Sequence, residues 1–198
     1  MKNLLLIVGV VISAISTANA QTPATPLSTG SVKVKVNVEL TAFQTIEIGT
    51  AGQDGQVSSG YADEVTLRYE DTDDYKNGVQ KTIANQLKVS SVGTGYKIIT
   101  TFGNNGIMSK DYGTSTTPID ASRLLDIEID GIVGQGTFPA KTYTFGTLGD
   151  ATTSVLDKSL SVKYIGKPLI NAYLLKDLLN DFNSAKYNID VVYTIAAN

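Results

Sequence analysis

The sequence predicts an all-β protein, an antiparallel β-sandwich of Ig-like or jelly-roll-like topology with one short amphipathic helix near the C-terminus. Roughly eight or nine segments alternate apolar and polar side chains over about five to ten residues, which is typical of half-buried strands. Clusters of the turn-forming residues Gly, Asn, Asp, Ser and Pro separate these segments. A single segment, between the last two expected strands, carries apolar residues at helical spacing instead.

Residues 1–20 have the three parts of a secretory signal peptide. Lys2 supplies the positive charge, residues 4–15 supply the apolar stretch, and Ala18 and Ala20 are the small residues of the cleavage site. We therefore expect cleavage after Ala20 and export to the periplasm, the cell surface or the medium. No later stretch approaches the roughly 18 consecutive apolar residues of a membrane span, so we expect no membrane insertion after cleavage.

The exported chain is expected to consist of a flexible N-terminal arm, residues 21–30, and a single β-sandwich domain, residues 31–198. The arm is rich in Pro and Thr and shows no periodicity. The remaining length suits one domain of ordinary size with a substantial core. The sequence contains no internal repeat and no recognisable interdomain linker.

The domain opens with the most regular strand pattern in the chain, S-V-K-V-K-V-N-V-E-L over residues 31–40. Strict alternation predicts that its apolar side chains share one face of a strand. Such a strand is either the first strand of its own sheet, with residues 187–196 as its natural partner, or a strand added to the sheet of another copy. In the second case five residues would carry assembly: Val32, Val34, Val36, Val38 and Leu40.

Further strands are expected along the rest of the domain. Residues 86–92 and 96–102 are expected to form a hairpin through Gly93-Thr94-Gly95, and Asn77-Gly78 indicates a tight turn. Residues 50–60 are rich in Gly, Gln and Ser and are expected to form a loop. The other expected strands are residues 42–48, 64–70, 124–130, 141–145, 158–165 and 187–196.

Residues 171–182 form the expected helix, because their leucines and a phenylalanine recur at intervals of three or four residues. Lys, Asp and Asn residues occupy the other side of this helix. Asn171 is a suitable N-cap. We expect the helix to lie across an edge or an open end of the sandwich and to connect the last two strands.

The composition excludes several kinds of catalytic and metal centre, because the chain contains no His, no Cys and no Trp. No Ser-His or Cys-His pair can be built, nor a zinc site with nitrogen or sulfur ligands. Without Lys2, 15 basic residues stand against 19 acidic ones, a formal net charge of −4. A nucleic-acid partner would need a basic face, so none is expected. We therefore expect a non-enzymatic protein without a cofactor.

One acidic run is a weak candidate for a cation site. Asp71, Asp73 and Asp74 offer carboxylates of the kind that Ca²⁺ prefers. A solvated acidic turn is the favoured interpretation of this run.

A second acidic group lies on one face of the strand expected over residues 124–130. Its three carboxylates repel one another and need water, a cation or facing lysines. We expect a charged outer face with Lys33 and Lys35 as suitable partners for Asp126, Glu128 and Asp130.

Most of the ten tyrosines occupy alternating strand positions, where packing against the sheet explains them. Three others fall in expected loops. Because tyrosine offers an amphipathic contact surface, these three are candidates for contact with a sugar or a protein: Tyr61, Tyr75 and Tyr112.

Several segments together resemble bacterial β-sandwich surface proteins of the fimbrial-subunit and spore-coat-U type. They are F-Q-T-I-E-I-G at residues 43–49, the region 86–100, L-S-V-K-Y-I-G at residues 160–166, and K-Y-N-I-D-V-V-Y-T-I at residues 186–195. The resemblance implies an Ig-like, pilin-type sandwich and assembly into surface fibres.

These observations favour a non-enzymatic, secreted structural subunit of a bacterial surface appendage or coat, associating with itself or with other surface subunits. In that case residues 31–40 would carry assembly, either by strand exchange or by edge pairing. The alternative is a monomeric exported adhesin, or a module that binds a carbohydrate or a protein through loop tyrosines. A Ca²⁺-stabilised periplasmic protein is a third, weaker hypothesis.

Overall fold

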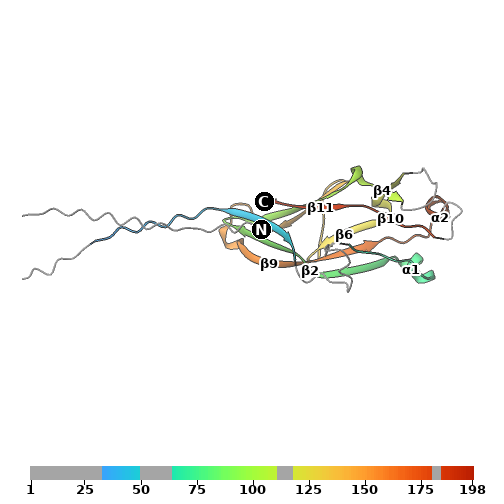
Figure 1. Cartoon of the computed structure of the whole chain (residues 1–198), viewed down its shortest axis with the longest axis horizontal. Coiled ribbons are helices and arrows are strands. Elements are labelled where there is room, and N and C mark those ends of the chain that lie inside the picture. Colours follow the sequence, from blue (N-terminus) through green and yellow to red (C-terminus); the bar gives the residue numbers. More distant parts are fainter. Residues whose placement is uncertain (1–32, 50–63, 111–117, 180–183) are drawn as a thin grey trace, which may run out of the picture. The chain divides into compact units, whose positions relative to one another are not determined.

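The computed structural model describes residues 33–49, 64–110, 118–179 and 184–198. Contacts divide the chain into two units, Met1–Val38 and Glu39–Asn198. The described part of the second unit is all-β and sandwich-like, with antiparallel sheets and a short helix near the C-terminus, so the predicted fold class is confirmed (Figure 1).

The first layer is a five-stranded sheet in which every pairing is antiparallel. Its two long strands, β2 and β9, run between the end of the domain that carries the C-terminus and the end that carries the two helices (Figure 1). In spatial order, the strands are β1 (Phe43–Ile48), β2 (Val79–Val92), β9 (Val155–Gly166), β6 (Leu125–Ile129) and β7 (Ile132–Val133).

The second layer consists of two three-stranded sheets, also antiparallel. One has the order β11 (Val191–Ala197), β3 (Tyr96–Phe102) and β8 (Ala140–Phe145). The other has the order β10 (Tyr187–Asn188), β4 (Ile107–Lys110) and β5 (Ile119–Asp120). Within the described ranges, three short 3-10 helices lie in the connections: Asn104–Gly106, Ala121–Arg123 and Ala151–Thr153.

Part of the strand order matches that of an immunoglobulin sandwich. The order β1-β2-β9-β6 corresponds to A-B-E-D, and β11-β3 corresponds to F-C. Strand β8 occupies the place next to C although it follows β6 in the chain. The place next to F, where strand G pairs in a complete sandwich, has no strand among the described residues. The second layer therefore ends at β11.

The core lies between the layers and follows the alternation of the strands. Leu87, Ile98 and Leu160 are completely buried and come from β2, β3 and β9. Ile127 and Ile129 of β6 join them, as their alternation with acidic residues predicts. Each such side chain stabilises the fold by roughly 1.5–3 kcal/mol relative to exposure. Since the chain has no cysteine, packing and hydrogen bonds stabilise the domain without a disulfide.

The strands expected over residues 42–48, 124–130, 141–145 and 158–165 are confirmed as β1, β6, β8 and β9, with slightly different bounds. The strand expected over residues 187–196 is divided into β10 and β11.

The predicted hairpin between residues 86–92 and 96–102 is wrong. Strand β2 pairs with β1 and β9, and β3 pairs with β11 and β8, so Gly93-Thr94-Gly95 carries the chain from one layer to the other. Each strand has two neighbours within its own sheet, which leaves no edge for the other.

Residues 64–70 form no regular strand, although their burial alternates as the sequence predicts. Val65 and Leu67 pack against the main core, and the Tyr69 hydroxyl donates to the carbonyl oxygen of Lys167 at 2.8 Å. This extended segment covers part of the core without joining a ladder.

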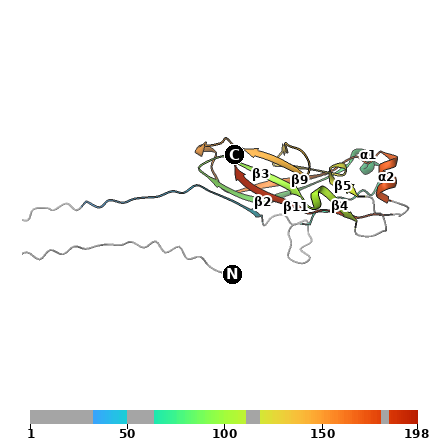
Figure 2. The ribbon, with the colours of Figure 1, turned by 90° about the horizontal axis from the view of Figure 1, so that it is seen from above.

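Two helices lie together at one end of the domain, opposite the C-terminus (Figure 2). Helix α1 (Thr72–Asn77) was expected as a turn, and Gly78 ends it with a φ of 78°. A Cβ at Gly78 would collide with the carbonyl oxygen of Gly166, so glycine is required there.

Helix α2 (Ala172–Leu179) confirms the predicted helix, although residues 180–183 lie outside the described residues. Leu174 and Leu178 are buried in a second core cluster with Ile119 and Leu169. The Asn171 side chain accepts from the backbone amides of Tyr173 and Leu174, as an N-cap does.

Replacing Asn171 by Ala is expected to lower the free energy of unfolding by about 1 kcal/mol, because two helix amides lose their acceptor. Denaturant unfolding followed by circular dichroism measures the change. Asn171→Asp is the matched control, since aspartate caps a helix equally well. Equal stability of Asn171→Ala and the parent chain would contradict the proposed cap.

Candidate functional site

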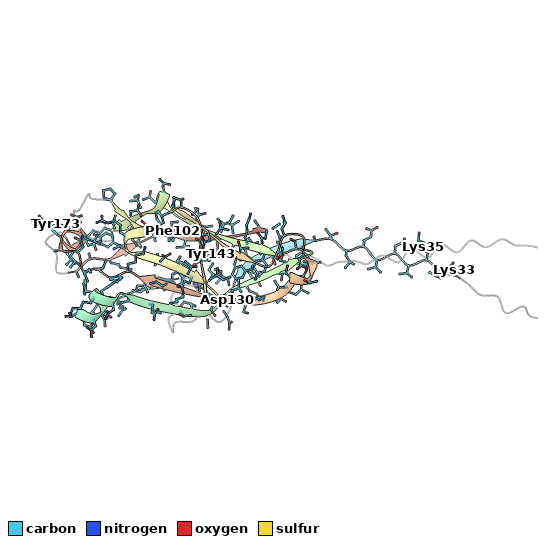
Figure 3. The ribbon with its side chains drawn as sticks, turned by 180° about the vertical axis from the view of Figure 1, so that it is seen from behind. Lys33, Lys35, Phe102, Asp130, Tyr143 and Tyr173 are labelled. Atoms are coloured by element: carbon cyan, nitrogen blue, oxygen red, sulfur yellow. The ribbon has the colours of Figure 1, made fainter. Side chains whose placement is uncertain are left out.

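The segment that precedes β1 is apolar and exposed. Residues 33–42 form neither helix nor strand, and their side chains are exposed throughout. The exposed fractions of its apolar side chains lie between 76% and 91%: Val34, Val36, Val38 and Leu40. Lys33 and Lys35 alternate with these valines (Figure 3). Four large apolar side chains of this segment are therefore open to solvent.

One of the two expectations for this segment is therefore wrong. The sequence allowed residues 31–40 to be the first strand of their own sheet, paired with the C-terminal strand. Among the described residues, 33–40 belong to no ladder, and β11 pairs with β3 along one edge only. Ser31 and Val32 lie outside the described residues. The segment Lys33–Leu40 is called the extension below.

The outer edge of β11 is the complementary feature. The inner edge of β11 is the edge that pairs with β3, where Val191, Tyr193 and Ile195 lie opposite Phe102, Thr100 and Ile98. No described strand pairs with the other, outer edge. The sequence V-V-Y-T-I-A-A contains no charged residue and no proline, the residues that usually protect an exposed edge. Val192 on its outer face is also largely exposed.

The other sheet edges of the described domain are less open. Strand β7 has two residues, and β1 carries Glu47 in an ion pair with Lys88. The free side of β8 is partly occupied by Gln135, whose backbone exchanges two hydrogen bonds with Thr142. Among the described strands, β11 is therefore the long edge best suited to accept another strand.

The core is incompletely covered where β11 approaches β1. Val191, Tyr193 and Ile195 pack against the core but are only partly buried, as is Ile46 of β1. Ile48 lies in register with the completely buried Leu87 and is itself 47% exposed. Strands β1 and β11 are the neighbouring edges of the two layers. We call this group the β1–β11 seam: Ile46, Ile48, Val191, Tyr193 and Ile195.

A hydroxyl pair fixes β11 to the opposite layer. The Tyr193 and Tyr164 hydroxyl oxygens lie 2.9 Å apart and join β11 to β9. Burial is the main cause of a raised Tyr193 pKa, and the neighbouring Tyr164 raises it further. The hydroxyl of Tyr143 donates to the carbonyl oxygen of Ile127 at 2.9 Å, which joins β8 to β6 across the core.

The three carboxylates of the β6 face are paired with lysines, but the predicted partners Lys33 and Lys35 are wrong. The Nζ atoms of Lys167, Lys163 and Lys158 lie 4.0, 3.1 and 3.6 Å from carboxylate oxygens of Asp126, Glu128 and Asp130 respectively. These lysines belong to β9 or follow it directly, and β9 is the neighbour of β6.

The acidic run Asp71, Asp73 and Asp74 begins helix α1. The Asp71 carboxylate accepts from the amides of Asp73 and Asp74, and the Asp74 carboxylate accepts from the amide of Asp71. Together they form a capping box. No group of three or more acidic residues in the described part of the chain is arranged to hold a metal ion.

The three loop tyrosines do not converge on a described site. Tyr61 and Tyr112 lie outside the described residues. Tyr75 lies in α1 rather than in a loop, and its ring packs against Tyr69 with a centroid distance of 5.5 Å. Packing at the helix end of the domain therefore accounts for Tyr75.

Comparison with protein-family models, with curated proteins and with solved structures gives no match. Within the described residues, neither helix has the length and apolarity to cross a membrane.

Tyr193→Phe is expected to lower the free energy of unfolding by about 1 kcal/mol, because the hydroxyl pair with Tyr164 is lost. Thermal and denaturant unfolding at pH 7 measure this change. Tyr173→Phe is the control, since Tyr173 is exposed. Equal destabilisation by both substitutions would contradict a specific role for the pair.

Stability is expected to fall as the pH rises above 10. Burial raises the pKa of Tyr96 and Tyr143 to about 12, and it also raises that of Tyr193. Between pH 10 and the folded-state pKa, the unfolded chain loses tyrosine protons that the folded chain keeps, so deprotonation favours unfolding. The stabilising contribution of these buried tyrosines is complete below pH 10 and is lost progressively as the pH rises through their folded-state pKa. Tyr193→Phe should show a shallower decline, and an unchanged slope would contradict the contribution of Tyr193.

Proposed function

We propose that the chain is an exported, non-enzymatic structural subunit of a bacterial surface appendage or coat, which assembles by β-strand addition. The observation that carries the proposal is the combination of an exposed, alternating apolar extension with an uncharged, unpaired edge at β11. The extension has apolar side chains without a covering surface, and the β11 edge has backbone hydrogen-bonding groups without a described partner strand.

The extension matches the β11 edge chemically. A strand added beside β11 would form backbone hydrogen bonds with its outer edge, and alternate side chains would fall on the core side. Val34, Val36, Val38 and Leu40 would then cover the β1–β11 seam. Each stabilises the complex by roughly 1.5–3 kcal/mol if fully buried. Ordering the backbone offsets this by about 1–2 kcal/mol per residue, so the backbone hydrogen bonds and a long register are both needed.

A second copy of the chain is the favoured acceptor. Only Thr41 and Ala42 separate Leu40 from the first residue of β1. A two-residue hairpin loop needs positive φ values, which Asn-Gly, Asp-Gly or Gly-Gly sequences adopt and Thr-Ala does not. The extension is therefore poorly suited to fold back beside its own β1, and it is free to pair with another subunit.

Export and the resemblance to fimbrial subunits support the same proposal. Residues 1–20 have the pattern of a signal peptide, and an exported chain with a free strand meets other copies outside the cytoplasm. The absence of His and Cys removes most nucleophilic catalytic centres. The N-terminal sequence of the exported protein should begin at Gln21.

Val36→Glu is expected to abolish assembly, because it places a charge on the apolar face of the extension. Gel filtration and electron microscopy of the exported protein measure the result. Lys35→Glu is the matched control. It introduces the same residue one position away, on the opposite face of the extension, and should leave polymers intact. A stable monomer from the parent chain would overturn the proposal and favour the exported binding module or adhesin.

A synthetic peptide with the sequence of residues 31–40 is expected to bind the Val36→Glu protein at β11. In an isotope-labelled sample, the largest amide shifts should map to Val191–Ala197. A peptide in which Val34, Val36 and Val38 are replaced by Ser is the control, and it should bind much more weakly. Shifts confined to β7 or β8 would show that another edge accepts the strand.

A further inference from the structure

We propose that consecutive copies also dock end to end, with the exposed Leu148 loop of one copy against Ile170 and Tyr173 of the next. This inference rests on the proposed strand addition and adds a second interface to it. It follows from the direction of the added strand and from the length of the tether between the extension and β1.

We call the end of the domain that carries residues 93–95 and 147–149 the turn end. It contains Leu148. The amide of Gly95 donates to the carbonyl oxygen of Thr147 at 3.0 Å, and the amide of Gly149 donates to the Thr94 hydroxyl oxygen at 2.8 Å. These bonds fix both neighbours of Leu148, whose side chain is 70% exposed. The start of β1 lies at the same end, because a Cβ at Gly93 would lie 3.1 Å from the Ala42 Cβ.

We call the opposite end, which carries α1 and α2, the helix end. Two apolar side chains are exposed there, next to residues that are buried in the second core cluster. Leu169, Leu174 and Leu178 are buried beneath α2, whereas Ile170 and Tyr173 are 74% and 83% exposed. Figure 3 shows Tyr173 at this end of the domain. Two large exposed side chains beside buried neighbours form a small apolar surface that the fold of the domain does not need.

Strand β11 runs from the helix end toward the turn end. Tyr187, just before it, donates its hydroxyl to the carbonyl oxygen of Leu178 in α2. Asn198, just after it, donates its amide to the carbonyl oxygen of Gly95 at the turn end. Every described pairing in the domain is antiparallel. An extension added antiparallel to β11 would therefore point its Leu40 toward the helix end of the acceptor.

The short tether then brings the two ends together. Three residue steps from Leu40 to Phe43 span at most about 11 Å. The donor's β1 begins at its turn end, so that end must lie close to the helix end of the acceptor. Leu148 of the donor and Ile170 and Tyr173 of the acceptor are the most exposed large apolar side chains at these two ends. Their contact would be a heterologous interface, which repeats without closing and produces an open chain.

A parallel extension would lead to a different assembly. Leu40 would then lie at the acceptor's turn end, the two turn ends would meet, and a reciprocal exchange would close a two-fold dimer. The pairing of the ends therefore distinguishes the antiparallel arrangement from the parallel one.

Cysteine cross-linking tests the contact directly, because the parent chain contains no cysteine. Leu148→Cys and Tyr173→Cys are introduced together into the full-length exported protein, assembled, and treated with a short thiol-to-thiol cross-linker. We expect a ladder of covalent oligomers on a denaturing gel. Each single variant should remain monomeric on that gel. Leu148→Cys combined with Val133→Cys, which is exposed on the side strand β7, is the matched control and should give no ladder.

Two results would overturn the inference while leaving the proposed function intact. One is a discrete covalent dimer from Leu148→Cys alone, which indicates that turn ends meet. The other is an assembled double variant, visible by electron microscopy, that gives no ladder. Failure of the parent chain to assemble at all would instead overturn the proposed function.

Discussion

The structure depends on one packing constraint: the inner face of a five-stranded sheet must be covered by a second layer made of two smaller sheets. Strands β2 and β9 run the length of the domain, whereas the opposite layer changes from β11-β3-β8 to β10-β4-β5 along it. The segment 64–70 covers a further part of the core with Val65 and Leu67. Coverage is poorest along the β1–β11 seam, where the G strand of an immunoglobulin sandwich would lie.

Strand β11 borders the seam and is attached to the domain through its ladder with β3 and its contact with β9. A strand with one free edge has half of its backbone hydrogen-bonding groups unpaired by protein, and it is prone to fraying or to pairing with another chain. The Tyr193–Tyr164 hydroxyl pair ties β11 to β9, and its ladder with β3 extends over its full length. In the proposed assembly, a strand added to β11 would meet an edge that already pairs along its full length with β3, so only the incoming strand would have to become ordered.

Alternation predicted most strands of the two layers because it depends on which face of each strand is buried, but the alternating residues 33–40 and 64–70 form no strand. Leu125, Ile127 and Ile129 lie inward, and the predicted N-cap at Asn171 starts α2. Helix α1 was missed although its signal is present, since Asp71 and Asp74 stand three residues apart as a capping box requires. The supposed hairpin at Gly93-Thr94-Gly95 failed because pairing partners are distant in sequence. For the same reason, the sequence of β11 does not by itself tell which of its two edges is unpaired.

The two-residue tether has a mechanical consequence for the proposed chain of subunits. A long flexible linker would let neighbouring domains swivel independently, as beads on a string do. Thr41 and Ala42 are too few for that. Each domain would inherit a fixed rotation from the one before it, so the polymer would bend and twist as a rod. The stiffness of the polymer would then depend on the two-residue tether between subunits as much as on the β-sandwich itself.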